Sequence, residues 1–139
     1  MFNDSMSQVA LIRKQKPKWQ AGLLNGVGGK IEDGETGVDA MRREFFEETG
    51  AHTLRVDWYH FCNMHGKNSD GSEFYIEFFY AFGKLDSLQS QEEEKIELHA
   101  VNPVLSGVEL TIGNLRWLIA MATDFGKGVH PPKLVTAEY

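Results

Sequence analysis

The sequence is poor in cysteine and proline and has no long run of apolar residues. Cys62 is the only cysteine, so no disulfide can form within the chain, which fits a reducing compartment. No apolar stretch approaches the roughly 20 residues that a membrane-spanning helix needs. The first residues lack the basic region and the apolar run of a signal peptide. We therefore expect a cytoplasmic protein with no membrane partner.

Positive charge is also scarce. The chain has 14 Lys and Arg against 20 Asp and Glu, a net charge of −6. A nucleic-acid polymer binds a basic surface, so we do not expect one as a partner. A small phosphorylated ligand stays compatible with this charge, because a bound metal ion can reverse the local sign. With 42% apolar and 24% charged residues, the 139-residue chain is predicted to form one domain over residues 1–139.

Residues 28–51 concentrate glycine and acidic side chains, and read GGKIEDGETGVDAMRREFFEETGA. A helix is predicted between Thr36, a plausible N-cap with Asp39 three residues on, and Gly50, a C-cap. Gly34 is the expected positive-φ residue of the preceding turn. The apolar stripe of the helix is Val38, Met41 and Phe45.

Three glutamates share a second face of this predicted helix. Each residue advances about 100°, so Glu44, Glu47 and Glu48 fall within an arc of about 100°. Like charges so close repel one another, unless a cation binds between them. Magnesium prefers such oxygen ligands. The alternative is a solvated acidic face supported by an Arg43–Glu47 pair, but no lysine is interleaved with the glutamates, which favours a metal site.

The same stretch resembles the signature of the Nudix hydrolase family. All its charged and glycine positions match over 23 residues; Ala51 stands where a larger aliphatic residue is usual, and Val27 where many relatives have proline. The matching positions are Gly29, Glu35, Arg43, Glu44, Phe45, Glu47, Glu48, Gly50 and Ala51. The resemblance implies an α/β fold, the Nudix-type α/β/α sandwich with a mixed central sheet. The order of predicted elements agrees with it.

The resemblance also implies a magnesium cofactor, with manganese as a substitute, and assigns roles. Glu47 and Glu48 would be metal ligands, and Glu44 a ligand or the base that activates water. The backbone carbonyl of Gly28 would be a further ligand, and Arg43 would orient Glu44 by a charge-assisted hydrogen bond.

Two further roles concern acids outside this set of metal ligands. Glu35 is expected to brace the loop or to add to the outer metal shell. One further metal ligand would come from the acidic region before the last strand, from Glu93, Glu94 or Glu97, with Glu94 the choice we carry forward. The glycines do not form a nucleotide-binding P-loop, because Leu24 and Ile31 stand where a glycine and a hydroxyl residue are needed.

The predicted reaction is magnesium-dependent hydrolysis of a phosphoanhydride bond in a nucleoside diphosphate linked to another group, with a nucleoside triphosphate as the first choice of substrate. A dinucleoside polyphosphate is the next choice. Other classes are a non-catalytic Nudix-like module that binds a nucleotide, and a purely structural acidic domain. The complete set of glutamates favours the enzyme. The oligomeric state cannot be read from the sequence.

The remaining elements follow from periodicity and turn residues. Asp70-Gly71 predicts a hairpin turn, Pro103 is expected to end a strand, and Gly126 to Pro132 to form a loose tail. Both faces of residues 74–82 are apolar, which predicts a central strand covered on both sides. Strands are predicted at residues 9–12, on either side of a glycine bend in 23–31, and at 54–64, 74–82 and 96–101, with a second helix at 114–125.

Several side chains keep two interpretations. The basic loop of residues 13–18 is solvated or touches phosphates. Trp19 plugs the core or stacks on a base, and Glu77 is a site residue or a solvated carboxylate. His99 is expected to be packed or exposed rather than a ligand. The residues suggested for substrate binding are Trp19, Asn25 and Lys30, with Phe74 and Tyr80 as weaker pocket residues.

Overall fold

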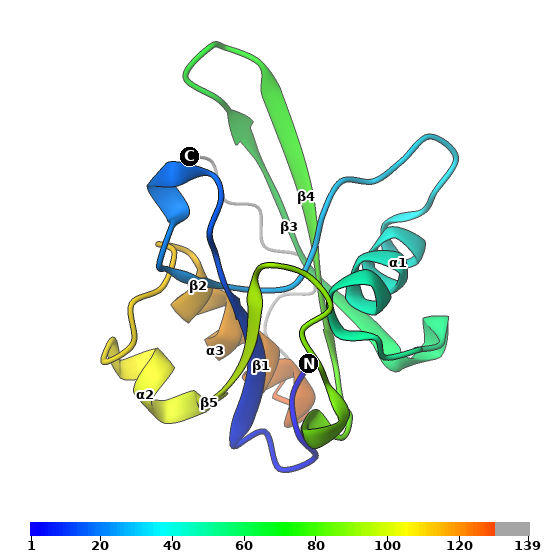
Figure 1. Cartoon of the computed structure of the whole chain (residues 1–139), viewed down its shortest axis with the longest axis vertical. Coiled ribbons are helices and arrows are strands. Elements are labelled where there is room, and N and C mark those ends of the chain that lie inside the picture. The colour runs from blue at the N-terminus through cyan, green and yellow to red at the C-terminus, as the bar shows by residue number, and fades with distance from the viewer. Residues whose placement is uncertain (130–139) are drawn as a thin grey trace.

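The computed structural model describes residues 1–129, which form two small antiparallel sheets flanked by helices (Figure 1). One sheet has the order β2-β1-β5, and the other is the β3-β4 hairpin. Parallel contacts within this range come from isolated bridges, such as Phe2 with Phe82. The strands are β1 (Gln8–Arg13), β2 (Leu24–Asn25), β3 (Trp58–Lys67), β4 (Glu73–Ala81) and β5 (Lys95–Ala100).

Helices lie on both sides of the strands, with α1 on one flank and α2 and α3 on the other (Figure 1). Their bounds are α1 (Gly37–Thr49), α2 (Val101–Ser106) and α3 (Leu115–Gly126). This arrangement agrees with the predicted α/β/α layering. None of the helices in residues 1–129 has the length and apolar character needed to cross a bilayer.

The caps of α1 are those predicted from the sequence. The backbone N–H of Asp39 donates to Thr36 Oγ1 over 3.4 Å, which satisfies one of the free donors at the start of the helix. Gly50 ends the helix in the left-handed conformation, with φ of 70°, and its N–H bonds to the Phe46 carbonyl. Both ends of the helix that carries the glutamates are therefore fixed locally.

Two apolar clusters hold the layers together. The smaller one anchors α1: Phe45 is fully buried and meets Trp58 edge to face, with ring centroids 5.1 Å apart. Burying one such ring contributes about 2–3 kcal/mol. Val38 and Met41 pack against the same cluster, so the predicted apolar stripe is confirmed. The larger cluster joins α3 to the sheets and includes Leu11, Leu24, Phe61, Tyr80, Leu118 and Ile119.

Two predictions about strands are wrong and a third is correct only in part. Residues 27–31 form no strand, and the Lys30 carbonyl bonds to Arg43 instead of a ladder partner. The strand predicted at 54–64 begins only at Trp58, after a single 3-10 turn.

The β4 strand is covered on both faces only in its second half. Phe78 and Tyr80 pack in the larger cluster, and Phe79 and Ala81 in the smaller one. The strand is not central, since it pairs with β3 alone among the described residues, and the end of the hairpin projects from the body (Figure 1), which leaves Tyr75 exposed.

Pro103 does not end a strand. The strand β5 ends at Ala100, and Pro103 lies in the first turn of α2, a helix that was not predicted. Proline is tolerated there because the first backbone N–H groups of a helix have no partner within it. The other boundaries fit better, with Asn114 as the N-cap of α3 and the predicted hairpin turn at Asn68 to Gly71. Of the predicted tail, Gly126 closes α3, and Pro131 and Pro132 lie outside the described residues.

Candidate active site

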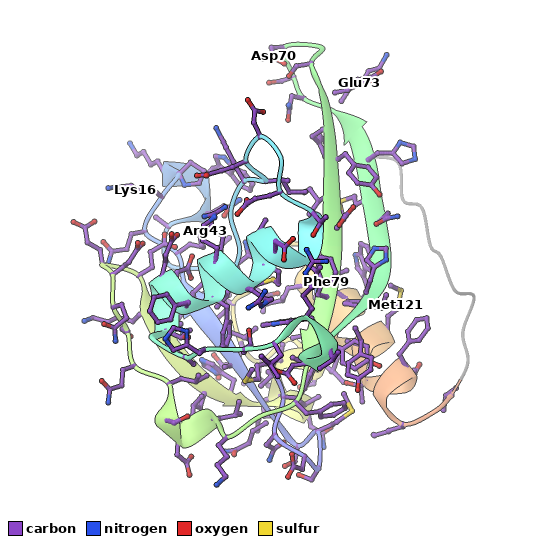
Figure 2. The ribbon with its side chains drawn as sticks, turned by 90° about the vertical axis from the view of Figure 1, so that its right-hand side faces the viewer. Lys16, Arg43, Asp70, Glu73, Phe79 and Met121 are labelled. Atoms are coloured by element: carbon purple, nitrogen blue, oxygen red, sulfur yellow. The ribbon has the colours of Figure 1, made fainter. Side chains whose placement is uncertain are left out.

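Arg43 organises the acidic face of α1 (Figure 2). Its guanidinium donates to both oxygens of Glu35, over 2.8 and 3.0 Å, and to Glu44 over 2.7 Å. It also reaches Glu47 over 3.3 Å and the Lys30 carbonyl over 2.9 Å. The hydrogen bond predicted between Arg43 and Glu44 is therefore present, and Glu35 ties Arg43 to the turn before the helix.

The charges in this network stabilise one another. The carboxylates of Glu35 and Glu44 raise the pKa of Arg43, and the hydrogen bond from Arg43 is the main cause that lowers the pKa of Glu35. Glu35 also accepts from the backbone N–H of Glu32 over 3.0 Å. The turn of residues 32–35 is thus held against α1 by a charged pair as well as by its own backbone.

The glycine pair lets the chain pass close to Glu44. A Cβ at Gly29 would overlap the carboxylate of Glu44, so only glycine leaves that group where it lies. Gly28 meets nothing within the same range. The loop of residues 28–30 therefore runs along the acidic face of α1, as a backbone ligand to a metal would require.

Glu48 differs from the other acids of the helix because it is buried without a partner. It is 9% exposed, and among the described residues no hydrogen bond reaches its Oε2 atom. Burial raises the pKa of Glu48 to about 7, with Glu44 and Glu94 adding to the effect and Lys14 opposing it. A buried carboxylate oxygen without a donor is costly unless a cation binds it.

The donor set of this face fits a hard divalent cation. Glu44, Glu47 and Glu48 supply carboxylate oxygens, and the loop beside them supplies backbone carbonyls. As the side chains stand, no three His, Cys, Asp or Glu groups within residues 1–129 converge on one metal position. The Arg43 guanidinium holds two of these carboxylates, with contacts of 2.7 Å to Glu44 and 3.3 Å to Glu47.

A second charged network lies on β1 and β5. Arg13 forms a two-pronged pair with Glu97, both contacts at 2.6 Å, and this lowers the pKa of Glu97 to about 2. His99 packs between Glu97, at 2.9 Å, and Glu109, at 3.4 Å. His99 therefore takes the packed alternative of the two placements expected for it.

Glu94 forms a separate charged pair just before β5. It pairs with Lys14 over 2.6 Å and accepts from the backbone N–H groups of Gln15 and Lys16. Burial alone would raise the pKa of Glu94, but these hydrogen bonds outweigh it and lower that pKa. Lys14 is therefore not part of a solvated loop. Sequence reasoning missed this pairing because the two residues are 80 positions apart and carry no local signal.

The residues suggested for substrate binding make no contact with one another in the described part of the chain. Trp19 is 73% exposed, so the core-plug interpretation is wrong. Asn25 accepts from the Gly26 N–H over 2.7 Å, and the side chain of Lys30 is exposed. Tyr80 is a core residue stacked on Tyr59.

Glu77 links the projecting hairpin to the start of α1. A Cβ at Gly37 would overlap its carboxylate, so Glu77 occupies the space beside the first turn of the helix. The negative charge suits the positive end of the helix dipole. Glu77 is thus not fully solvated, and among the described residues it makes no contact with Glu48. Its carboxylate lies at the N-terminus of α1, where a negative charge is favourable.

Comparison with known families agrees with this fold. The NUDIX domain model matches residues 1–110. The chain therefore belongs to the Nudix hydrolase family.

Two curated relatives match over a shorter stretch. The oxidized purine nucleoside triphosphate hydrolase of Mus musculus is 43% identical over 53 residues, 38% of this chain and 32% of that protein. The protein of the same description from Danio rerio is 46% identical over 50 residues, 36% of this chain and 30% of that protein. The chain thus matches about a third of the length of these relatives.

Solved structures extend the likeness over most of the chain. The MutT protein of Bacillus halodurans superposes with a TM-score of 0.69 and 23% identity, covering 96% of this chain and 82% of that one. The NUDIX domain of Shewanella oneidensis NrtR, solved with ADP ribose, gives a TM-score of 0.69 and 18% identity over 85% of this chain and 77% of that one. At these identities the comparison establishes the fold.

Proposed function

We propose that this protein hydrolyses a phosphoanhydride bond of a nucleoside triphosphate, with Mg²⁺ bound by Glu44, Glu47, Glu48 and the Gly28 carbonyl. The observation that carries the proposal is the buried Glu48 carboxylate, whose Oε2 has no hydrogen-bond partner among the described residues, beside two acids held by one arginine. Triphosphates are favoured over other diphosphates because two partial relatives are described as purine nucleoside triphosphate hydrolases.

The roles of the side chains follow from their contacts. A bound divalent cation would screen the phosphate charges and lower the pKa of a bound water. Glu44, hydrogen-bonded to Arg43, would accept the proton of the attacking water or bind the cation directly. Arg43 would orient that carboxylate, and would itself be held by Glu35. Phe45, buried on the neighbouring apolar stripe, fixes the rotation of the helix.

The test is a substrate panel with product identification. Normal and oxidised purine and pyrimidine nucleoside triphosphates, a dinucleoside polyphosphate and ADP-ribose are incubated with Mg²⁺. We expect a triphosphate to be the best substrate and to yield a monophosphate and pyrophosphate. Preference for the dinucleoside polyphosphate would replace the substrate assignment. Binding of nucleotides without turnover of any of them would point to the binding-module class.

The variant Glu47→Gln links the panel to the proposed site. Removing one important catalytic group typically costs about 10²-fold or more in kcat, and we expect at least that loss here with an unchanged circular dichroism spectrum. Near-wild-type turnover would contradict the metal-site assignment.

A further inference from the structure

Glu94 is bonded through both of its carboxylate oxygens to one short segment of the chain. Its Oε2 accepts from Lys14 Nζ over 2.6 Å. Its Oε1 accepts from the backbone N–H groups of Gln15 over 2.7 Å and of Lys16 over 3.2 Å. The side chains of Lys14 and Glu94 are only 18% and 17% exposed. This is a largely buried charged pair that also satisfies two backbone donors.

The neighbouring Glu93 shows how different an ordinary surface acid is. Its side chain is 75% exposed, and it reaches Lys16 only at 3.5 Å. Exposed pairs of this kind contribute about 0–1 kcal/mol. The two glutamates are adjacent in sequence, so the contrast comes from their surroundings.

The segment that leads to Glu94 lies against α1 at Glu48, because the backbone N–H of Gln91 donates to the Glu48 carbonyl over 3.0 Å. The positive charge of Lys14 acts in turn on the Glu48 carboxylate and lowers its pKa, against the larger effect of burial. A surface hollow of about 360 Å³ adjoins the same segment and is lined by Arg13, Lys14, Gln15, Ala21, Gly22, Lys95 and Glu97.

We propose that Glu94 is a positioning residue and not a metal ligand: it clamps residues 14–16 so that the Lys14 ammonium is presented beside Glu48. Its own charge is already compensated by Lys14 and by two backbone donors, whereas Oε2 of Glu48 has no such partner. Coordination of a metal by Glu94 would have to break the contact with Lys14.

The consequence for the reaction rests on the proposed function. Lys14 would supply a fixed positive charge to the polyphosphate of a bound nucleoside triphosphate. A lysine held in place by a buried carboxylate loses less side-chain freedom on binding than a solvated one, so the clamp improves substrate affinity. The expected signature is an effect on KM rather than on kcat.

The first test needs no substrate. Glu94→Ala removes all three acceptor contacts, and Glu93→Ala is the matched control one residue away. Amide hydrogen exchange of Gln15 and Lys16 should become at least about tenfold faster in Glu94→Ala and stay at the wild-type rate in the control, because local opening sets the exchange rate. The Kd for Mn²⁺ alone, followed by electron paramagnetic resonance, should stay within about threefold of wild type.

Two results would overturn the proposal: Mn²⁺ binding at least about tenfold weaker in Glu94→Ala, as expected for loss of a ligand, or unchanged exchange of the two amides. If Glu94→Ala does not fold, Glu94→Gln is measured for Mn²⁺ affinity in its place, since an amide is a poor replacement for a carboxylate ligand. Mn²⁺ binding at least about tenfold weaker in Glu94→Gln would then overturn the proposal in the same way.

The second test is a double-mutant cycle with a nucleoside triphosphate. Lys14→Met and Glu94→Ala should each raise KM by about tenfold with kcat within about threefold, and the double variant should be no worse than either. Additive effects would contradict the clamp. If the wild-type protein turns over no triphosphate, the proposed function fails, while the exchange and Mn²⁺ measurements still decide the role of Glu94.

Discussion

The acids of α1 and those of the β5 region are similar in number but are treated differently by the fold. Glu97 and Glu94 each lie against a basic side chain, at 2.6 Å in both cases. On α1, Glu44 and Glu47 share the single guanidinium of Arg43, and Oε2 of the third glutamate, Glu48, has no hydrogen-bond partner among the described residues. Carboxylates that are fully paired fix the position of a segment. A buried carboxylate without a partner leaves the charge balance to be completed by a ligand.

The strongest way to break this comparison is Glu48→Gln. We expect Mn²⁺ affinity to fall by at least about tenfold, because an amide is a poor ligand for a hard cation. Without metal, the same change should remove a pH dependence. The pKa of Glu48 is about 7 in the folded protein, above its ordinary value of 4.5, so the folded state holds the proton more tightly and its stability falls as pH rises between these values.

The measurement is urea denaturation of both proteins in EDTA at pH 5 and pH 8. Wild type should lose on the order of 2 kcal/mol more than Glu48→Gln over this interval, a value reduced from the full shift to allow for partial solvation. Titrating groups elsewhere cancel in the difference between the two proteins. Equal pH dependence would show that Glu48 is not held in an unfavourable ionised state.

A sharper probe of the acidic face is Gly29→Ala. The added Cβ would meet only the flexible end of Glu44, so the fold should survive while that carboxylate is displaced from Arg43. We expect kcat to fall by about tenfold, on the scale of a misplaced catalytic group. Gly26→Ala is the control, because a Cβ there meets nothing within 4 Å. Similar kinetics in the two variants would mean that the position of Glu44 does not matter.

The smallest expected effect is that of a substitution in the β5 region, where the acids are paired with basic side chains. Glu97→Gln should cost about 1 kcal/mol of stability at neutral pH, since the pair with Arg13 is partly exposed and screened. The pKa of Glu97 is about 2, below its ordinary value of 4.5. The stability that Glu97 contributes is therefore fully present above pH 4.5 and is lost as the pH falls toward 2. Denaturation at pH 7 and pH 3 checks this, and Mn²⁺ affinity should be unaffected.

How far the sequence could predict these features depends on whether their causes are local. The helix α1, its Thr36 and Gly50 caps and the common face of its glutamates follow from spacing within 15 residues. The Arg43–Glu44 hydrogen bond follows from the family signature. Each of these contacts lies within one turn and one helix, where periodicity and capping rules apply.

Some of the predictions that failed depend on contacts between distant segments. The apolar faces of β4 suggested burial, but whether a strand is covered depends on which elements reach it, and the end of the hairpin extends past them. The pairing of Lys14 with Glu94 could not be predicted either, because the two residues are 80 positions apart in the chain. The prediction for Pro103 fails for a local reason, since a proline in a first turn suits a helix as well as it ends a strand.

The contact between Glu77 and Gly37 has a consequence for the geometry of the acidic face. A carboxylate oxygen of Glu77, on β4, fills the place that a side chain at residue 37 would take. The first residue of α1 therefore lies directly against the hairpin. A bulkier residue at 37 would displace the Glu77 carboxylate and remove this link between the helix and the hairpin. Glu44, Glu47 and Glu48 lie two to three turns further along the same helix, so all three acids depend on how its first turn is held.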